Sequence, residues 1–211
     1  MKTDFSAVIL SAGFSSRMHA FKPLLQIGGL PVVGRLVNLF YQAGLTEIIV
    51  VVGHRHCEIE DYLKTLPAEI RRFVKLKYNP IFEQGMYTSV QAGVSEVSAD
   101  KSGFFILPVD YPLVGNSVLG ELMKFWCNGK LAETEVVYPV YKNRRGHPPL
   151  LSTELISEII TKEQKTGLRS FLQNHQNRAE NLPVEDESIL WDMDKKEDYI
   201  RLSEVYAKFN R

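Results

Sequence analysis

The sequence predicts an α/β protein of three layers, in which a doubly wound and mostly parallel sheet lies between helices. Near-continuous apolar segments at 7–10, 46–52 and 103–109 are typical of parallel strands that are buried on both faces. Segments with the apolar spacing of helices separate them, and this alternation predicts right-handed crossovers. Each of the three strands runs into a residue expected at the ligand-binding edge of such a sheet. These three residues are Gly13, Gly53 and Asp110.

The remaining elements follow the same alternation along the chain. After the first strand, a turn at 26–31 leads to a helix over 32–43, which Gly44 ends. The next predicted elements are the strand 46–52, a helix at 58–66, a strand at 74–78, a helix at 85–97 and the strand 103–109. The later part predicts a helix at 117–127, a strand at 135–141, a loop at 142–149, helices at 153–160 and 168–174, an extended segment at 181–184 and a last helix at 197–209.

Length and composition predict one domain over residues 1–211. A chain of 211 residues that is 45% hydrophobic supports one sizeable core and is short for two. The formal net charge is zero, which argues against non-specific binding of nucleic acid. No apolar run has the length of a membrane span, so we expect no membrane association and a cytoplasmic protein. Cys57 and Cys127 form no C-x-x-C pattern, and we expect two buried, reduced thiols.

Small side chains follow the first strand in the segment 11–16. They allow backbone amides to face an anion, and Arg17 and Lys22 add two cations before Pro23 prevents a helix. Amide donors with an Arg and a Lys suit a di- or triphosphate. An ordinary polar loop with both cations solvated fits this spacing equally well, since neither G-x-G-x-x-G nor a Gly-Lys-Ser/Thr loop is present.

The pattern Leu10-Ser11-Ala12-Gly13-x-Ser15-x-Arg17-Met18-x-x-x-Lys22 resembles a known signature. It is similar to L-A-A-G-x-S-x-R-M-G-x-x-K of the molybdenum cofactor cytidylyltransferases, within the MobA-like NTP transferases. Ser11 replaces an alanine of the signature. His19 replaces a glycine, so the sequence does not decide the geometry of the loop there. The resemblance implies a Rossmann-like fold of the nucleotide-diphospho-sugar transferase type. It also implies nucleotide binding by Leu10, Ser11, Ala12, Gly13, Ser15, Arg17 and Lys22.

Two acidic segments match the metal-binding parts of the same family. Asp110, in an Asp-x-Pro-x-Val pattern, is implied to bind Mg²⁺ and nucleotide, whereas the residues alone also fit a carboxylate that caps a turn. The stretch 191–199 is similar to the family's D-I-D-T-P-E-D-Y segment. From it we expect Asp192 to share the metal, and Asp194 to cap the final helix together with Glu197.

Further segments imply contacts with the base and with an acceptor. Residues 79–93 resemble N-P-x-x-x-x-G-M-x-x-S-L-x-x-G, which implies that Asn79 and Ser89 contact the nucleotide. Residues 143–150 resemble G-x-x-G-H-P-x-L-F, which implies acceptor binding by Gly146 and His147. The segment 166–169 echoes G-x-R-x-x-L and adds Arg169 as an anion contact. Arg144 and Arg145 are either solvated or further contacts of this kind, and His54 and His56 are expected in a surface loop.

The resemblance implies the transfer of CMP from CTP to molybdopterin, with release of pyrophosphate. Arg17, Lys22 and Asp110 would be the catalytic residues and Mg²⁺ the cofactor. Ala12 stands where guanylyl enzymes of the group carry glycine, which favours CTP over another NTP. The expected partners are the molybdopterin-type acceptor and a molybdoenzyme that receives the product. Two alternatives stay open: another phosphorylated acceptor such as a sugar phosphate, and a non-catalytic module that delivers the cofactor.

Overall fold

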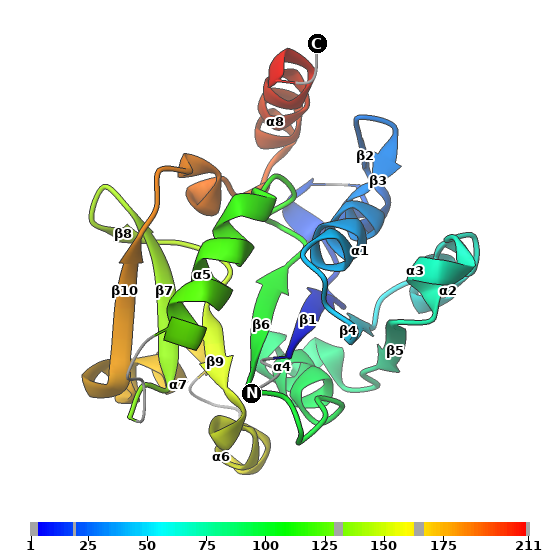
Figure 1. Cartoon of the computed structure of the whole chain (residues 1–211). Coiled ribbons are helices and arrows are strands. Elements are labelled where there is room, and N and C mark those ends of the chain that lie inside the picture. The colour runs from blue at the N-terminus through cyan, green and yellow to red at the C-terminus, as the bar shows by residue number, and fades with distance from the viewer. Residues whose placement is uncertain (1–3, 19, 129–132, 163–166, 210–211) are drawn as a thin grey trace.

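The structure, a computed structural model, describes residues 4–18, 20–128, 133–162 and 167–209. Within them, eight strands form the central sheet (Figure 1). The strand order is β10-β7-β9-β6-β1-β4-β5, and β8 pairs with β7. The strands are β1 (Phe5–Ser11), β4 (Ile48–Val52), β5 (Val74–Tyr78), β6 (Gly103–Pro108), β7 (Val136–Tyr141), β8 (Arg144–Arg145), β9 (Leu150–Ser152) and β10 (Ala179–Pro183). A separate hairpin joins β2 (Gln26–Ile27) to β3 (Leu30–Pro31).

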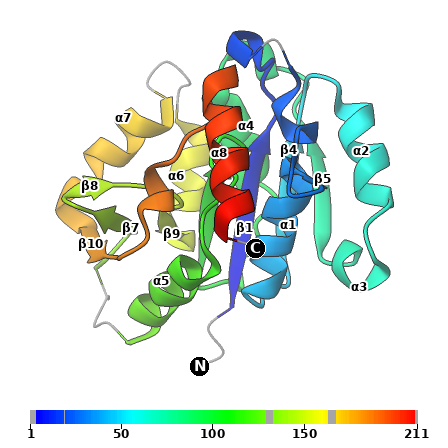
Figure 2. The same cartoon turned by 90° about the horizontal axis from the view of Figure 1, so that it is seen from above.

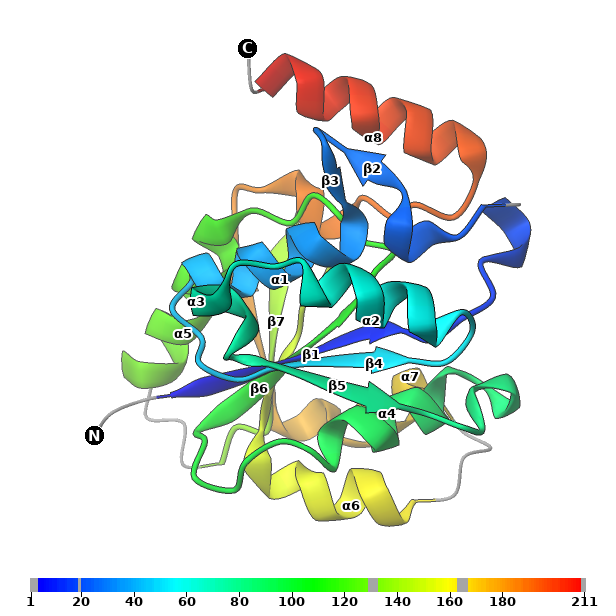
Figure 3. The same ribbon diagram turned by 90° about the vertical axis from the view of Figure 1, so that its right-hand side faces the viewer.

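Helices cover both faces of this sheet, as the three-layer prediction requires (Figures 2 and 3). One face packs against α1 (Val32–Gln42), α2 (His56–Lys64), α3 (Ala68–Arg71) and α5 (Asn116–Asn128). On the same side, α8 (Lys196–Phe209) lies over the β2–β3 hairpin (Figure 3). The other packs against α4 (Met86–Val94), α6 (Ile156–Thr161) and α7 (Gly167–Asn174). Alternate residues of β1 divide between the two layers: Ala7 and Ile9 face the first, Val8 and Leu10 the second.

The first strand lies at the point where the strand order reverses. β1 pairs in parallel with β4 on one side and with β6 on the other. The chain passes from β1 through α1 to β4, and returns from β5 through α4 to β6 across the opposite face (Figure 3). Ligands of doubly wound sheets bind at the carboxyl ends of the strands beside such a reversal. The fold therefore puts a binding position at the ends of β1 and β6.

The structure confirms the fold class and corrects several details. The stretch predicted as one loop from 142 to 149 contains β8, whose hairpin turn uses Lys142 and Asn143 at positive φ. β9 follows, antiparallel to β6 and β7, so the sheet is mixed in its second half. Both cysteines are exposed, in contrast to the predicted burial. The reason is that Cys57 and Cys127 lie on helical turns that face away from the core.

A buried carboxylate joins the amino-terminal ends of the strands around β1. Glu47, 4% exposed, accepts hydrogen bonds from Ser6 Oγ at 2.5 Å and from Lys75 Nζ at 2.7 Å. It also accepts bonds from the backbone amide and the hydroxyl of Ser98, beyond α4. Burial by itself raises the pKa of Glu47, but the hydrogen bonds from Lys75, Ser6 and Ser98 outweigh it and lower the pKa from 4.5 to about 2.

Glu47→Gln therefore reduces the acid sensitivity of folding. Because the folded-state pKa is lower than the unfolded one, Glu47 stabilises the fold above pH ~5, and this contribution is lost as the pH falls toward ~2. We expect the variant to lose on the order of 2–3 kcal/mol at pH 7 and much less at pH 3, in urea denaturation at both pH values. Glu69→Gln, at an exposed position of α3, is the control without an effect. An undiminished acid sensitivity in Glu47→Gln would contradict this account.

Candidate active site

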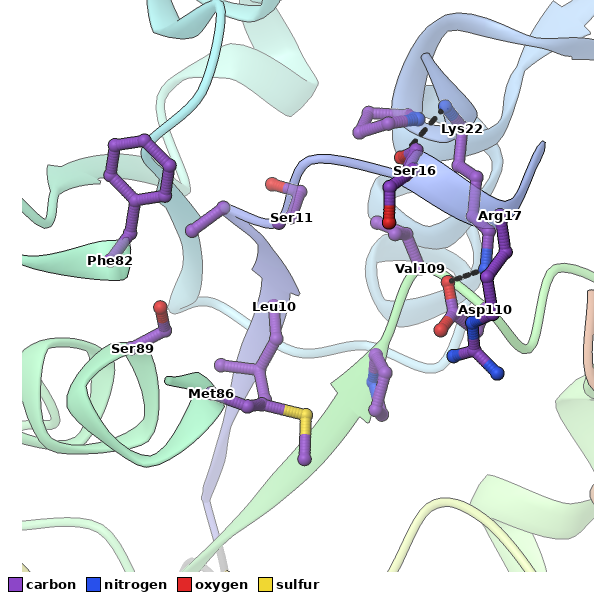
Figure 4. Close-up of a pocket in the computed structure, with 15 residues that line it drawn as sticks. Leu10, Ser11, Ser16, Arg17, Lys22, Phe82, Met86, Ser89, Val109 and Asp110 are labelled. Atoms are coloured by element: carbon purple, nitrogen blue, oxygen red, sulfur yellow. Dashed lines mark hydrogen bonds and ion pairs between the residues drawn. The ribbon is translucent and has the colours of Figure 1, made fainter. Parts of the chain in front are cut away.

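A cavity of about 230 Å³ opens at the carboxyl ends of β1 and β6 (Figure 4). The segment that follows β1, the turn after β6 and the start of α4 form its walls. Its charged half carries Arg17, Lys22 and Asp110, and its apolar half carries Leu10, Phe82 and Met86. The other lining residues are Ser11, Ala12, Gly13, Ser15, Ser16, Pro23, Ser89, Pro108 and Val109.

Lys22 is the centre of the charged half. Its side chain is 6% exposed, and its ammonium lies 3.0 Å from Asp110 Oδ1 and 3.1 Å from Asp194 Oδ1. Three segments distant in sequence therefore meet at one buried cation. Burial raises the pKa of the Asp110 carboxyl, the Lys22 ammonium opposes this rise, and the Asp194 carboxylate adds to it.

The loop before Lys22 is held by its own serine. Ser15 adopts a left-handed conformation with φ of 56°, and its Oγ accepts a hydrogen bond from the Lys22 amide at 3.2 Å. Arg17 lies in the short helix Ser16–Met18, where its guanidinium donates to Asp194 Oδ2 at 2.6 Å while its side chain stays 68% exposed. Arg17 and Lys22 thus share the same carboxylate. His19, which departs from the resembled signature, lies outside the described residues.

The prediction that Asp194 caps the final helix is wrong. Its carboxylate contacts Lys22 and Arg17 instead, because the turn before α8 directs it toward the cavity. Asp198, in the first turn of α8, accepts the amides of Asp194 at 3.1 Å and Lys195 at 2.8 Å with its Oδ2 and so holds the turn that precedes the helix. Glu197, the predicted partner in that cap, is exposed.

Asp192 lies near the site but outside the ion-pair cluster. It is exposed and does not line the cavity. Its charge acts on Tyr111, the residue after Asp110: burial raises the pKa of Tyr111 to about 12, with additional contributions from Asp192, Asp110 and Asp194. Asp194, and not Asp192, therefore forms an ion pair with Lys22, the residue that also pairs with Asp110.

Ser89 and Asn79 have different positions in the apolar half. Ser89 lines the cavity from α4, whereas Asn79 is 2% exposed and lies behind its wall. The Asn79 amide donates to Thr88 Oγ1 at 2.7 Å and to Ser89 Oγ at 3.0 Å, and its oxygen accepts the Ile81 amide at 3.1 Å. Asn79 therefore does not line the cavity, and its predicted nucleotide contact stays a prediction. Asn79 instead orients Ser89 and the turn before α4.

The residues after β1 form the floor between the two halves. Ser11 Oγ donates to the Val51 carbonyl at 2.7 Å, so its hydroxyl joins β1 to β4. Ala12 is 4% exposed, and its carbonyl accepts the His54 amide at 3.0 Å. A Cβ on Gly13 would meet no protein atom within 4 Å. The open space above Gly13 is therefore available to a ligand.

Two of the predicted acceptor-binding residues, Gly146 and His147, lie against Ile189 and Tyr111 respectively. A Cβ on Gly146 would lie 2.6 Å from the Ile189 carbonyl oxygen, so the close approach of these segments requires glycine there. The His147 ring packs on Tyr111 with centroids 4.2 Å apart. Burial lowers the pKa of His147 to about 4, and its buried Nδ1 has no hydrogen-bond partner among the described residues. His147 is therefore a neutral imidazole at pH 7.

Other predicted contacts lie outside the cavity. Arg169 is exposed on α7 and does not line the cavity. Arg145 is engaged by Asn181 and Gln176, each at 2.7 Å, which argues against an anion-binding role. Arg144 is exposed on β8. His54, as expected, lies in a loop beside the site, with its ring 5.1 Å from that of Phe14. The same expectation is wrong for His56, which begins α2.

Sequence reasoning did not single out the apolar wall. Phe82 and Met86 line the cavity, and Thr88 supports it. All three lie in the segment 79–93, which also contains Asn79 and Ser89. The resemblance of that segment could therefore have pointed to them, whereas their side-chain chemistry could not. Tyr111 was likewise passed over, although it follows Asp110 directly.

A mostly parallel sheet covered by helices on both faces, with an apolar and cationic cavity at its point of reversal, is typical of doubly wound nucleotide-binding proteins. A family model of the MobA-like NTP transferase domain matches residues 7–179. The chain belongs to this family, and it is a nucleotidyltransferase.

Individual relatives agree with the family assignment. The chain is 25% identical to the molybdenum cofactor cytidylyltransferase of Escherichia coli K12 over 95% of this chain and 96% of that protein. It is 32% identical to a bifunctional IPC transferase and DIPP synthase of Rubrobacter xylanophilus over 64% of this chain and 30% of that protein.

Solved structures share the fold. Rv0371c from Mycobacterium tuberculosis H37Rv superposes with a TM-score of 0.78 at 21% identity, over 96% of this chain and 99% of that one. A structure of the same protein in complex with manganese superposes with a TM-score of 0.74 over the same shares of the two chains. None of the helices that our structure describes is long and apolar enough to cross a membrane.

Gly13→Ala tests whether the space above this glycine belongs to a ligand. The added methyl meets no protein atom, so we expect the melting temperature to change by less than about 2 °C. The affinity for a nucleoside triphosphate should fall about tenfold, because the methyl enters the space that the ligand needs. Calorimetric titration together with thermal unfolding measures both quantities. A large loss of stability, or unchanged binding, would show that the space is not the ligand's.

Proposed function

We propose that this protein transfers CMP from CTP to molybdopterin, as the resemblance implies. An oxygen of the acceptor's terminal phosphate attacks the α-phosphorus of CTP, the bond from that phosphorus to the bridging oxygen breaks, and pyrophosphate leaves. The observation that carries the proposal is the Lys22 ammonium, held between Asp110 and Asp194 at the edge of a small cavity. Such a displacement needs positioning and charge neutralisation more than a protein nucleophile.

Arg17 and Lys22 are suited to bind the triphosphate and the leaving pyrophosphate. In the structure their charges are balanced by Asp110 and Asp194. Phosphate oxygens can replace these carboxylates as partners, because the side chains of Asp110 and Asp194 stay 33% and 27% exposed. The two cations then stabilise negative charge as it develops on the leaving group.

The carboxylate pair fits Mg²⁺ as a cofactor. Among the described residues, no three His, Cys, Asp or Glu side chains lie close enough to hold a metal by themselves. Mg²⁺ is commonly held by one or two carboxylates together with substrate phosphates, so Asp110 and Asp194 supply a suitable protein share. When bound, Mg²⁺ would draw phosphate groups together and neutralise their charge. The manganese complex of Rv0371c supports a divalent cation in this fold.

Asp194 is the better candidate for the second carboxylate ligand. The resemblance implied Asp192, but Asp194 shares Lys22 with Asp110 and Asp192 does not. Substitution of Asp192 therefore serves as the matched control for substitution of Asp194.

The choice of CTP and of molybdopterin is supported by one full-length relative and by Ala12 in the cavity lining. Tyr111, the residue after Asp110, packs on the neutral His147, and we place the acceptor on this side of the site, where these residues add no positive charge. The matched transferase of Rubrobacter xylanophilus is not named for molybdopterin, so another phosphorylated acceptor such as a sugar phosphate stays the second candidate. A cytoplasmic site of action and delivery to a molybdoenzyme are parts of this proposal.

The reaction can be tested with purified protein, CTP, Mg²⁺ and molybdopterin. We expect pyrophosphate release and a product heavier than the acceptor by one CMP unit in mass spectrometry. Asp110→Asn should lower the rate about 100-fold or more while the protein remains folded, because the amide loses the charge that holds the cation. GTP turnover above CTP turnover would contradict the assignment of the base, and transfer to a sugar phosphate alone would contradict the acceptor.

The pair Asp194→Asn and Asp192→Asn locates the second ligand. We expect Asp194→Asn to weaken Mg²⁺-dependent binding of CTP at least about tenfold, and Asp192→Asn to change it less than about twofold. The reverse order would return the role to Asp192. Absence of transfer in the wild type, with delivery of the cofactor unchanged in Asp110→Asn, would favour a module that delivers the cofactor without catalysing.

A further inference from the structure

The apolar half of the cavity is shaped by one aromatic side chain. Phe82 lies in the short helix Phe82–Gln84 between β5 and α4, and Figure 4 shows it opposite the charged half, near Ser11 and Ser89. Because the triphosphate requires the cations, this half is the part of the cavity left for the nucleobase. The inference therefore rests on the proposed function.

The backbone holds the turn that carries Phe82. The Gly85 amide donates to the Phe82 carbonyl at 3.2 Å, and the Gln84 amide donates to the Ile81 carbonyl at 3.0 Å. Asn79, buried beneath the turn, accepts the Ile81 amide. The Cα of Phe82 therefore has little freedom to move away from the cavity.

The ring of Phe82 is confined by two further neighbours. A Cβ on Gly53, at the end of β4, would lie 2.5 Å from Cγ of Phe82, so the ring rests directly on a bare backbone. Phe14 packs on it with centroids 5.1 Å apart and an interplanar angle of 54°. Gly53, Phe14 and the turn together restrict where the Phe82 ring can lie.

The small size of the cavity makes the position of the Phe82 ring important for the base that can bind. At about 230 Å³ it is smaller than the 300–1,000 Å³ usual for small-molecule sites, yet it has to accept part of a triphosphate and a base. A purine adds a second fused ring to the single ring of a pyrimidine. A fixed phenyl wall penalises that extra ring far more than a mobile side chain would.

We propose that Phe82, held in place by Gly53 and Phe14, limits the base half of the cavity to a single-ring base and so determines the choice of nucleotide. Phe14 is a positioning residue in this arrangement. The selection comes from the wall in addition to the methyl group of Ala12.

The test is calorimetric titration with CTP and GTP in the presence of Mg²⁺, which needs no acceptor. The wild type should bind CTP at least tenfold more tightly than GTP. Phe82→Ala should reduce this ratio at least fivefold by gaining affinity for GTP, and Phe82→Leu, which keeps apolar packing, should act in the same direction to a smaller extent. Ile81→Ala, at an exposed neighbouring position outside the cavity lining, should leave the ratio unchanged.

A double variant makes the test more specific. Gly53→Ala should weaken CTP binding at least fivefold by pushing the ring into the base half, and adding Phe82→Ala should restore affinity to that of Phe82→Ala alone. An unchanged CTP/GTP ratio in both Phe82 variants, tighter binding of GTP by the wild type, or no restoration in the double variant would overturn the inference.

The titrations also separate this inference from the proposed reaction. A shift of the ratio without any transfer to molybdopterin supports the wall and rejects the reaction. Transfer of CMP to molybdopterin with an unchanged CTP/GTP ratio in the Phe82 variants supports the reaction and rejects the role of Phe82. Absence of any nucleotide binding by the wild type overturns both.

Discussion

The contact of Lys22 with Asp110 and Asp194 is the interaction on which the site depends. An ammonium with 6% exposure needs opposite charge close by, since an unpaired buried charge costs several kcal/mol. Here two carboxylates supply it, one after β6 and one before α8. The solvent reaches the carboxylate side of this cluster and not the stem of the lysine. The lysine of this cluster is therefore buried, whereas its two carboxylates are accessible to charged ligands.

The rest of the molecule brings these three residues together. β1 and β6 pair in register, and this places the turn at Asp110 beside the loop that follows β1. The carboxyl-terminal helix completes the site from the other end of the sequence. The Tyr199 hydroxyl donates to the Gln26 carbonyl at 2.9 Å, and Gly28 leaves room for the ring of Tyr206, which a Cβ would approach to 1.9 Å. Docking of α8 on the β2–β3 hairpin thus positions Asp194.

Much of this arrangement could be predicted from the sequence because it follows from local patterns. Buried parallel strands produce near-continuous apolar runs, and the strand–loop segment around Gly13 carries residue types that occur together for phosphate binding. Lys22 and Asp110 were singled out by the family resemblance, because the residues alone also fit a solvated loop and a carboxylate that caps a turn. β9 was missed because three residues are too few to show a period, and β8 because a positive-φ turn at Lys142 and Asn143 has no strong composition signal.

The roles of the two aspartates near residue 193 could not be settled from sequence. Both fit a metal ligand and both fit a helix cap, and the choice depends on which one faces Lys22 after α8 has packed. Asn79 is a similar case, because an amide suited to a nucleobase is equally suited to buried hydroxyls such as those of Thr88 and Ser89. Long-range packing decides these roles, and single-sequence patterns do not contain it.

The most direct test of the central claim is a crystal structure of the protein with Mg²⁺ and a non-hydrolysable CTP analogue. The account predicts the cation between Asp110 and the triphosphate oxygens, with the Lys22 ammonium moved from carboxylate to phosphate. A triphosphate bound away from the Gly13 loop, or a cation held by carboxylates other than Asp110, would contradict it.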